Sequence, residues 1–142
     1  MEDATELVRR ALQLTDDADW AGREALMTAD CEMTTPSGAA RGPAATTAYS
    51  VPLTRAFPGG RHHVDLLVAA GGIVTGEGRW TGTPTGPLPT PDGEIPPTGR
   101  PVDLPFALVA RVDGGRIASM HVYFDQLGFL AQLGLVPQPQ AA

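Results

Sequence analysis

Gly114–Gly134, with the sequence GGRIASMHVYFDQLGFLAQLG, is the segment around which the rest of the chain can be arranged. Its pattern predicts a glycine turn, then a strand, then a short apolar helix from about Gln126 to Gln132. Successive side chains of a strand point to opposite faces of the sheet. One face would carry Ile117, Ser119, His121, Tyr123 and Asp125. This row of different polar groups favours the wall of a pocket, although the exposed face of an ordinary antiparallel strand is an alternative.

Three further strands are predicted upstream, over residues 61–70, 73–83 and 102–112, and glycine-rich turns follow the first and the last of them. Within 73–83, Trp80 shares a face with Gly76 and Gly78. Glycine inside a strand marks a bulge or a close approach of another backbone. Residues 84–101 are dense in proline, glycine and threonine and predict a long loop.

The N-terminal part of the chain predicts helices over 3–15, from near Trp20 to about Met27, and over roughly 43–57. An acid before Trp20 would cap the second helix. Pro43 suits the first turn of the third helix, whereas Pro52 should kink or split it. A short strand is predicted over 29–35 and a frayed tail over 136–142. Helices followed by long antiparallel strands indicate an α+β fold, in which a bent sheet and its helices enclose a cavity.

Composition limits the function. The 142 residues suffice for a single domain with a substantial core, and the net charge of −6, with no lysine, argues against nucleic acid or an anionic membrane as partner. No apolar run reaches membrane-spanning length, and the acidic N-terminus is unlike a signal peptide. The single cysteine, Cys31, excludes an internal disulfide and a thiolate metal site, and the expected compartment is the cytoplasm.

Four segments carry a resemblance to a known family: TGTPTGPL (81–88), IPPTGRPVDL (95–104), DGGRIASMHVYFDQ (113–126) and LAQLGLVP (130–137). Over nearly the whole chain, the order of elements resembles the SnoaL-like polyketide cyclases of the nuclear-transport-factor-2-like (NTF2-like) superfamily. One position departs from the family pattern, because relatives commonly have a histidine where this chain has Pro84.

The resemblance implies a cone-shaped α+β barrel over residues 1–142, with N-terminal helices packed on a strongly curved, mostly antiparallel sheet around a deep apolar pocket. It implies a homodimer that acts on a polyketide-like intermediate of secondary metabolism. The implied chemistry is an intramolecular aldol-type ring closure or a related isomerisation, without cofactor or metal. The family acid/base is an aspartate at the end of the last strand, which is Asp125 in this chain.

The residues themselves give separate reasons for catalytic roles. Asp125 has apolar neighbours, which would favour its neutral form and let the carboxyl both accept and donate a proton near neutral pH. It could instead only cap the helix that begins at Gln126. His121 could orient this carboxyl or donate to a carbonyl, or it could be an ordinary core histidine. Tyr123 is expected to contribute a hydroxyl to the pocket.

Other side chains are candidates for substrate binding. His62 and His63 point to opposite faces, so only one can face inward; His63 is the candidate, and with no third ligand the pair is a poor metal site. Glu77 would be a second acid/base if its face were the concave one, and otherwise a partner for Arg79. The apolar candidates for the lining are Met33, Phe57, Val64, Leu66, Trp80, Phe106 and Leu108.

Three alternatives stay open, because a fold alone does not select a reaction. One is a shape-driven cyclisation such as a [4+2] cycloaddition, in which no single residue is essential. Another is epoxide opening or hydration, which would need Asp125 near Arg79 or Arg111 and a second inward-facing acid. The third is a small-ligand binder without enzymatic activity.

Overall fold

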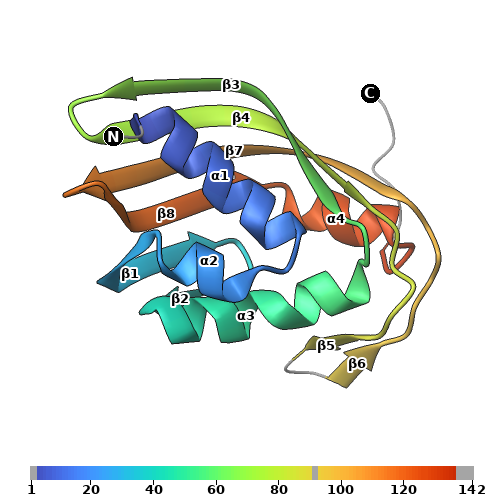
Figure 1. The fold of residues 1–142 in the computed structure, drawn as a ribbon. Coiled ribbons are helices and arrows are strands. Elements are labelled where there is room, and N and C mark those ends of the chain that lie inside the picture. Colours follow the sequence, from blue (N-terminus) through green and yellow to red (C-terminus); the bar gives the residue numbers. More distant parts are fainter. Residues whose placement is uncertain (1–2, 91–92, 137–142) are drawn as a thin grey trace.

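The computed structural model describes residues 3–90 and 93–136, and Figure 1 shows how their helices and strands are arranged. The helices are α1 (Ala4–Asp16), α2 (Trp20–Glu24), α3 (Pro43–Ala56) and α4 (Gln126–Gln132). The first strands are β1 (Met27–Thr35), β2 (Gly38–Arg41), β3 (Arg61–Ala70) and β4 (Ile73–Gly82). The later strands are β5 (Leu88–Thr90), β6 (Gly93–Ile95), β7 (Val102–Asp113) and β8 (Arg116–Phe124). The predicted α+β class is confirmed.

Six strands form one curved sheet in the order β2-β1-β8-β7-β4-β3. Every neighbouring pair is antiparallel except β1 and β8, which run parallel. The sheet is open, with β2 and β3 at its edges, and helices α1, α2 and α3 lie along one side of it (Figure 1). Sheet and helices together thus form the walls of a hollow, as predicted, although the strands alone do not close into a barrel.

The two N-terminal helices begin at capping aspartates. The carboxylate of Asp3 accepts the N–H of Glu6, and that of Asp19 accepts the N–H of Gly22, each at 2.9 Å. Such a bond satisfies one of the free N–H groups that every helix start exposes. The side of α1 that packs on the sheet is formed by Leu7, Val8, Ala11 and Leu12. Helix α2 ends earlier than predicted, at Glu24, since β1 begins three residues later, at Met27.

Helix α3 has Pro43 in its first turn, and it continues through Pro52 as one helix. Of the predicted kink or split at Pro52, the split does not occur, and the kink stays a prediction. Two elements were not predicted: strand β2, which lies between the strand predicted over 29–35 and the helix predicted from 43, and the β5–β6 hairpin inside the expected 84–101 loop. Most of the tail predicted to be frayed, 137–142, lies outside the described residues.

A bulge in β8 decides which of its side chains face inward. Arg111 pairs with Ser119 and Val112 pairs with Ile117, so Ala118 is an extra residue on the β8 side. An extra residue in one strand reverses the alternation of faces beyond it. Ile117 is therefore buried, whereas Ser119 and the following odd-numbered residues face away from the helices. The prediction that these residues share one face with Ile117 and form a pocket wall is wrong.

A second bulge, at Asp65, bends β3 over two glycines of β4. Leu66 pairs with Glu77, whereas Val64 pairs with Gly78. A Cβ atom on Gly76 or Gly78 would lie 2.1 Å from a carbonyl oxygen of β3, a distance at which the two atoms overlap. The close approach predicted for these glycines is confirmed, and it allows the sheet to bend around the cavity.

The core lies between the helices and the concave face of the sheet. One cluster joins α1 to β4 and β7, and its buried residues are Val8, Leu12, Val74, Phe106, Leu108 and Ala110. A second joins the end of α3 to β7 and α4, through Ala56, Phe57, Val102, Leu104, Phe129 and Leu133. A third packs α1 on β1 and β8, through Leu7, Ala11, Met27, Cys31 and Ile117. Residues of all three clusters line a cavity that their side chains do not fill.

Candidate active site

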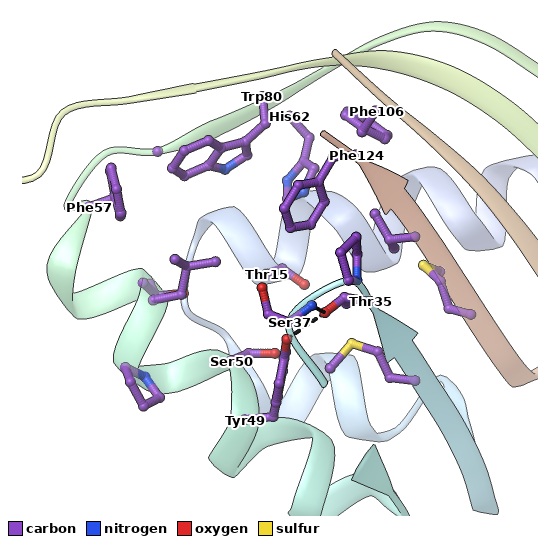
Figure 2. Close-up of a pocket in the computed structure, with 18 of the residues that line it drawn as sticks. Thr15, Thr35, Ser37, Tyr49, Ser50, Phe57, His62, Trp80, Phe106 and Phe124 are labelled. Carbon is purple, nitrogen blue, oxygen red and sulfur yellow. Dashed lines mark hydrogen bonds between the residues drawn. The ribbon is translucent and has the colours of Figure 1, made fainter. Parts of the chain in front are cut away.

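A cavity of about 760 Å³ lies between the concave face of the sheet and the helices. This volume is within the range of pockets that enclose small organic ligands. Its apolar wall includes Leu12, Met33, Phe57, Trp80, Leu104, Phe106, Met120, Val122, Phe124 and Phe129. Figure 2 shows the rings of Trp80, His62 and Phe124 on the sheet side of the cavity and hydroxyl-bearing side chains opposite them.

Trp80 is held in place by the neighbouring ring of Phe57 and fits into space that two glycines leave free. Its ring meets that of Phe57 edge to face, with centroids 4.9 Å apart and an interplanar angle of 76°. A Cβ atom on Gly60 or Gly82 would lie only 2.8 Å from the indole ring. These two glycines therefore provide the space that the indole occupies, and they fix a large flat surface against which a ligand can pack.

The polar centre of the cavity is a pair formed by His62 and Asp16. The carboxylate of Asp16 accepts the backbone N–H of His62 at 2.9 Å and contacts its ring Nδ1 at 2.6 Å. Both residues line the cavity; the side chain of His62 is 20% exposed and that of Asp16 is 6% exposed. Because an ionised carboxylate can only accept, Nδ1 carries the proton, and the lone pair of a neutral ring is on Nε2.

Packing holds the imidazole of His62 in one orientation. The ring stands edge-on to Phe106, with centroids 5.5 Å apart and an interplanar angle of 85°. Within residues 3–90 and 93–136, no hydrogen bond occupies Nε2. A carboxylate that fixes the tautomer of a histidine, with the other nitrogen free inside a pocket, is the arrangement of a general base.

A second polar cluster, beside the first, is built around Arg23. Its Nη1 donates to Thr15 Oγ1 at 3.2 Å and to Ser50 Oγ at 3.1 Å. The guanidinium carbon lies 4.8 Å from the ring centroid of Trp20. Arg23 lines the cavity but is only 4% exposed, and burial lowers the pKa of its guanidinium from the ordinary value. Its Nε and Nη2 are buried without a hydrogen-bond partner.

Four of the residues predicted to bind substrate line the cavity: Met33, Phe57, Trp80 and Phe106. Their contact with a ligand stays a prediction. Val64 and Leu108 pack in the core and do not line the cavity. Leu66 is half exposed on the other face, because the bulge at Asp65 reverses its direction.

Four other predicted residues lie away from the cavity. Tyr123 is 53% exposed, and His121 shares its outward-facing side of β8. His63 is exposed and contacts Thr81 Oγ1 at 2.8 Å, so the inward-facing histidine is His62 and the choice of His63 was wrong. Glu77 is exposed on the convex face, opposite the face that would have made it a second acid.

Asp125 caps helix α4, as the sequence allowed. Its Oδ1 accepts the N–H of Gly128 at 2.9 Å, and the residue is exposed. Its chain neighbours Phe124 and Gln126 line the cavity, whereas Asp125 itself does not. The acid/base role that the resemblance implies for Asp125 stays a prediction.

The arrangement needed for epoxide hydration does not form around Asp125. Arg79 is paired with Asp103 at 3.1 Å on the exposed face of the sheet, and Arg111 is also exposed. Among the described residues, no three His, Cys, Asp or Glu side chains lie together so that they could hold a metal ion. The helices of the same residues include none with the length and apolar character needed to cross a membrane.

The open, curved sheet that encloses an apolar pocket with its helices is the fold also seen in solved structures described as NTF2-like. The family model for SnoaL-like polyketide cyclases matches residues 5–133. The chain belongs to this family, as the resemblance of its sequence motifs predicts. No curated protein sequence gives a significant match.

Solved structures show the same fold. A candidate SnoaL-like polyketide cyclase from Jannaschia sp. CCS1 is 23% identical with a TM-score of 0.76, and the match covers 96% of this chain and 99% of that one. IdmH from Streptomyces antibioticus, described as a candidate polyketide cyclase, is 20% identical with a TM-score of 0.79, covering 94% and 99%. AclR from Streptomyces galilaeus, a candidate hydroxylase, is 18% identical with a TM-score of 0.79, covering 96% and 87%. Because their described activities differ, the neighbours support the fold and leave the reaction to be argued from the site.

Proposed function

We propose that this protein is a cofactor-independent cyclase or isomerase that closes a ring in a polyketide-like intermediate of secondary metabolism by an aldol-type reaction. The observation that carries the proposal is the His62–Asp16 pair, which faces an apolar cavity large enough for a small organic molecule. Membership of the SnoaL-like family supports the reaction class.

The proposed ring closure requires one group on the protein that accepts and then returns a proton. A carbon between two carbonyl groups is acidic, and the substrate itself delocalises the charge of the enolate. His62 Nε2 takes the proton from this carbon, and Asp16 stabilises the imidazolium that forms. The enolate carbon then bonds to a distant carbonyl carbon, and His62 returns the proton to the new alkoxide. The product is an isomer of the substrate, and no oxidant or reductant is consumed.

The aromatic wall supplies the remaining contribution, which is to fold the substrate. A flexible poly-β-carbonyl chain must bring its two reacting carbons together, and a site that holds this conformation removes much of the entropic barrier. The flat indole of Trp80 and the ring of Phe124 offer surfaces against which the chain can lie. Shape and proton transfer thus act on the same bound molecule.

The proposal is tested with purified protein and synthetic 1,3,7-triketones that carry an aromatic ring, in which the carbon between the first two carbonyls can attack the third and close a six-membered ring, in buffer that contains a metal chelator. Ring closure is followed by mass spectrometry, as a product with the mass of the substrate or of the substrate minus water. We expect acceleration above the buffer rate that is largely lost in His62→Gln.

Two other outcomes would each replace the proposal. An unchanged rate in His62→Gln, combined with a large loss in Trp80→Ala, would instead indicate a closure driven by the shape of the pocket. Tight binding without any turnover would indicate a ligand binder.

We also propose that the protein forms the homodimer that the resemblance implies, and that it does so through the convex face of its sheet. This face carries large apolar side chains that are exposed in the single chain: Leu66, Val68, Val109 and Tyr123. They belong to strands β3, β7 and β8, which share the same sheet. Burial of such a patch against its symmetric copy is a common basis of two-fold dimers.

A further inference from the structure

We propose that Arg23 makes one end of the cavity an anion site, and that the substrate of the proposed ring closure carries an ionised carboxylate that Arg23 binds. The inference rests on the proposed function for the identity of the ligand as substrate. The anion site itself rests only on the surroundings of Arg23.

The first observation is that Arg23 has no counter-ion within the described part of the chain. Arginine keeps its charge in proteins. The nearest acid in sequence, Glu24, accepts a hydrogen bond from Thr47 at 2.6 Å and forms no ion pair with Arg23. In the cavity wall, Asp16 is engaged by His62. The guanidinium is therefore a buried positive charge without an ion pair, which hydrogen bonds, one aromatic ring and the more distant charge of Glu24 partly compensate.

The second observation is that the hydroxyl groups around Arg23 have no proton left to offer. Thr15 Oγ1 donates to the carbonyl of Ala11 at 2.9 Å, and Ser50 Oγ donates to the carbonyl of Thr46 at 2.9 Å. Both hydroxyls then accept from Arg23 Nη1. The unused hydrogen-bonding capacity of this cluster consists of the N–H donors on Nε and Nη2 of Arg23. A ligand group that satisfies the cluster must be an acceptor, and a negatively charged one fits best.

The third observation concerns energy. Burying an unpaired charge is strongly unfavourable, and each buried donor without a partner adds to that cost. An apolar side chain of similar volume at position 23 would avoid both penalties. Nε and Nη2 of Arg23 are fully covered in this structure, so a carboxylate reaches them when the side chains over them move aside. It then removes both penalties, because a planar carboxylate can accept two parallel N–H donors from one guanidinium.

The position of Arg23 relative to the acid/base pair orients the substrate. Thr15, which accepts from Arg23, is followed in the last turn of α1 by Asp16, which holds His62. Arg23, Thr15, Asp16 and His62 all line the same cavity, so a ligand whose carboxylate is held at Arg23 shares that cavity with the acid/base pair. The remaining apolar part would extend along the wall that contains Trp80 and Phe106.

The test uses two probes of nearly equal shape, 2-naphthoate and the neutral methyl ketone 2-acetonaphthone, whose dissociation constants are measured by calorimetry at neutral pH. The unaltered protein should prefer the acid by about 10- to 100-fold, as one charge-assisted pair of hydrogen bonds provides. Arg23→Met should abolish this preference, and Arg23→Lys should retain part of it. Arg55→Met, which removes an exposed arginine outside the cavity lining, is the matched control and should leave the preference unchanged.

Each result decides the matter. Equal affinity for both probes, failure of the unaltered protein to bind either probe, or a preference that persists in Arg23→Met would overturn the inference. Thermal unfolding checks that Arg23→Met folds, and Arg23→Lys provides a second variant with the charge retained. If Arg23-dependent binding of the acid is found but no ketone is cyclised, the proposed function fails and the anion site stands. If ketones are cyclised but the protein does not prefer 2-naphthoate over 2-acetonaphthone, the anion site fails and the proposed function stands.

Discussion

Replacement of Asp16 by asparagine should remove most of the turnover while leaving the fold nearly as stable. Asp16 contacts His62 through two bonds, one from the backbone N–H and one from ring Nδ1. An asparagine can occupy the same space, but it has one oxygen and one NH₂ group in place of two oxygens. The backbone N–H can only donate, so the amide oxygen must face it and the NH₂ group must face Nδ1.

This forced orientation reverses the tautomer of the imidazole. The NH₂ group donates to Nδ1, so the ring proton moves to Nε2, the nitrogen that faces the cavity. A protonated Nε2 in a neutral ring cannot accept a proton from the substrate. Loss of a positioned general base lowers the rate by about 10²–10⁴-fold, which corresponds to roughly 3–5 kcal/mol in activation free energy. Both hydrogen bonds persist in neutral form, so the free energy of unfolding should fall by only about 1 kcal/mol.

The assay combines the rate of ring closure with thermal unfolding followed by circular dichroism. Asp17→Asn is the matched control, because Asp17 lies beside Asp16 but is exposed and pairs with Arg61 on the surface. Asp125→Asn is the second comparison, since asparagine also caps helices well and should preserve α4. We expect both of these variants to keep most of the turnover.

Two results would refute the reasoning. A rate for Asp16→Asn close to that of the unaltered protein would show that His62 is not the base. Loss of turnover in Asp125→Asn with a normal rate in Asp16→Asn would transfer the acid/base role to Asp125, as the family resemblance implies.

Three other predictions concern packing, the thiol and assembly. Gly82→Ala should displace Trp80 and lower the free energy of unfolding by about 1–3 kcal/mol, measured by denaturant titration, because the new methyl group overlaps the indole ring; unchanged stability would contradict the packing account. Burial raises the pKa of the Cys31 thiol, so iodoacetamide should modify the native protein far more slowly than the unfolded one. The raised pKa favours the neutral thiol in the folded state, so its contribution to stability is present at lower pH and is lost as the pH rises above the ordinary thiol value. Val109→Glu should convert the proposed dimer to a monomer in light scattering without unfolding it, and a dimer that persists would place the interface elsewhere.

Most of the fold followed from local patterns in the sequence. The apolar spacing in α1, the capping aspartates and the glycine turns between long strands act over a few residues, and each produced the element expected. Strand β2 and the β5–β6 hairpin were not predicted, because they depend on contacts with other segments and not on a local sequence pattern. β2 is stabilised mainly by pairing with β1, and the hairpin by its own pairing and by contact with α3. Neither has an apolar pattern of its own.

The candidate site was harder to predict because it depends on registers that single strands do not reveal. Alternation within β8 placed His121 and Tyr123 correctly relative to each other, but the bulge at Ala118 decided that both face outward. For the same reason, the sequence did not reveal whether His62 or His63 faces inward. The register of β3 on β4 decides this, because His62 pairs with Trp80, and paired residues lie on the same face of the sheet. Asp16 gave no signal, because its role arises only where the end of α1 meets β3.

The β5–β6 hairpin has a consequence for how this pocket could change during evolution. Leu88, Thr90 and Ile95 line the cavity, while the described strands of the hairpin, β5 and β6, form a separate two-stranded sheet beside the six-stranded one. Insertions, deletions or exchanges in this segment would therefore alter which molecules are admitted without disturbing the strands that carry His62 or the helix that carries Asp16. Under the proposed function, we therefore expect a graft of the corresponding segment from a relative to change the range of substrates and to leave the His62–Asp16 pair in place.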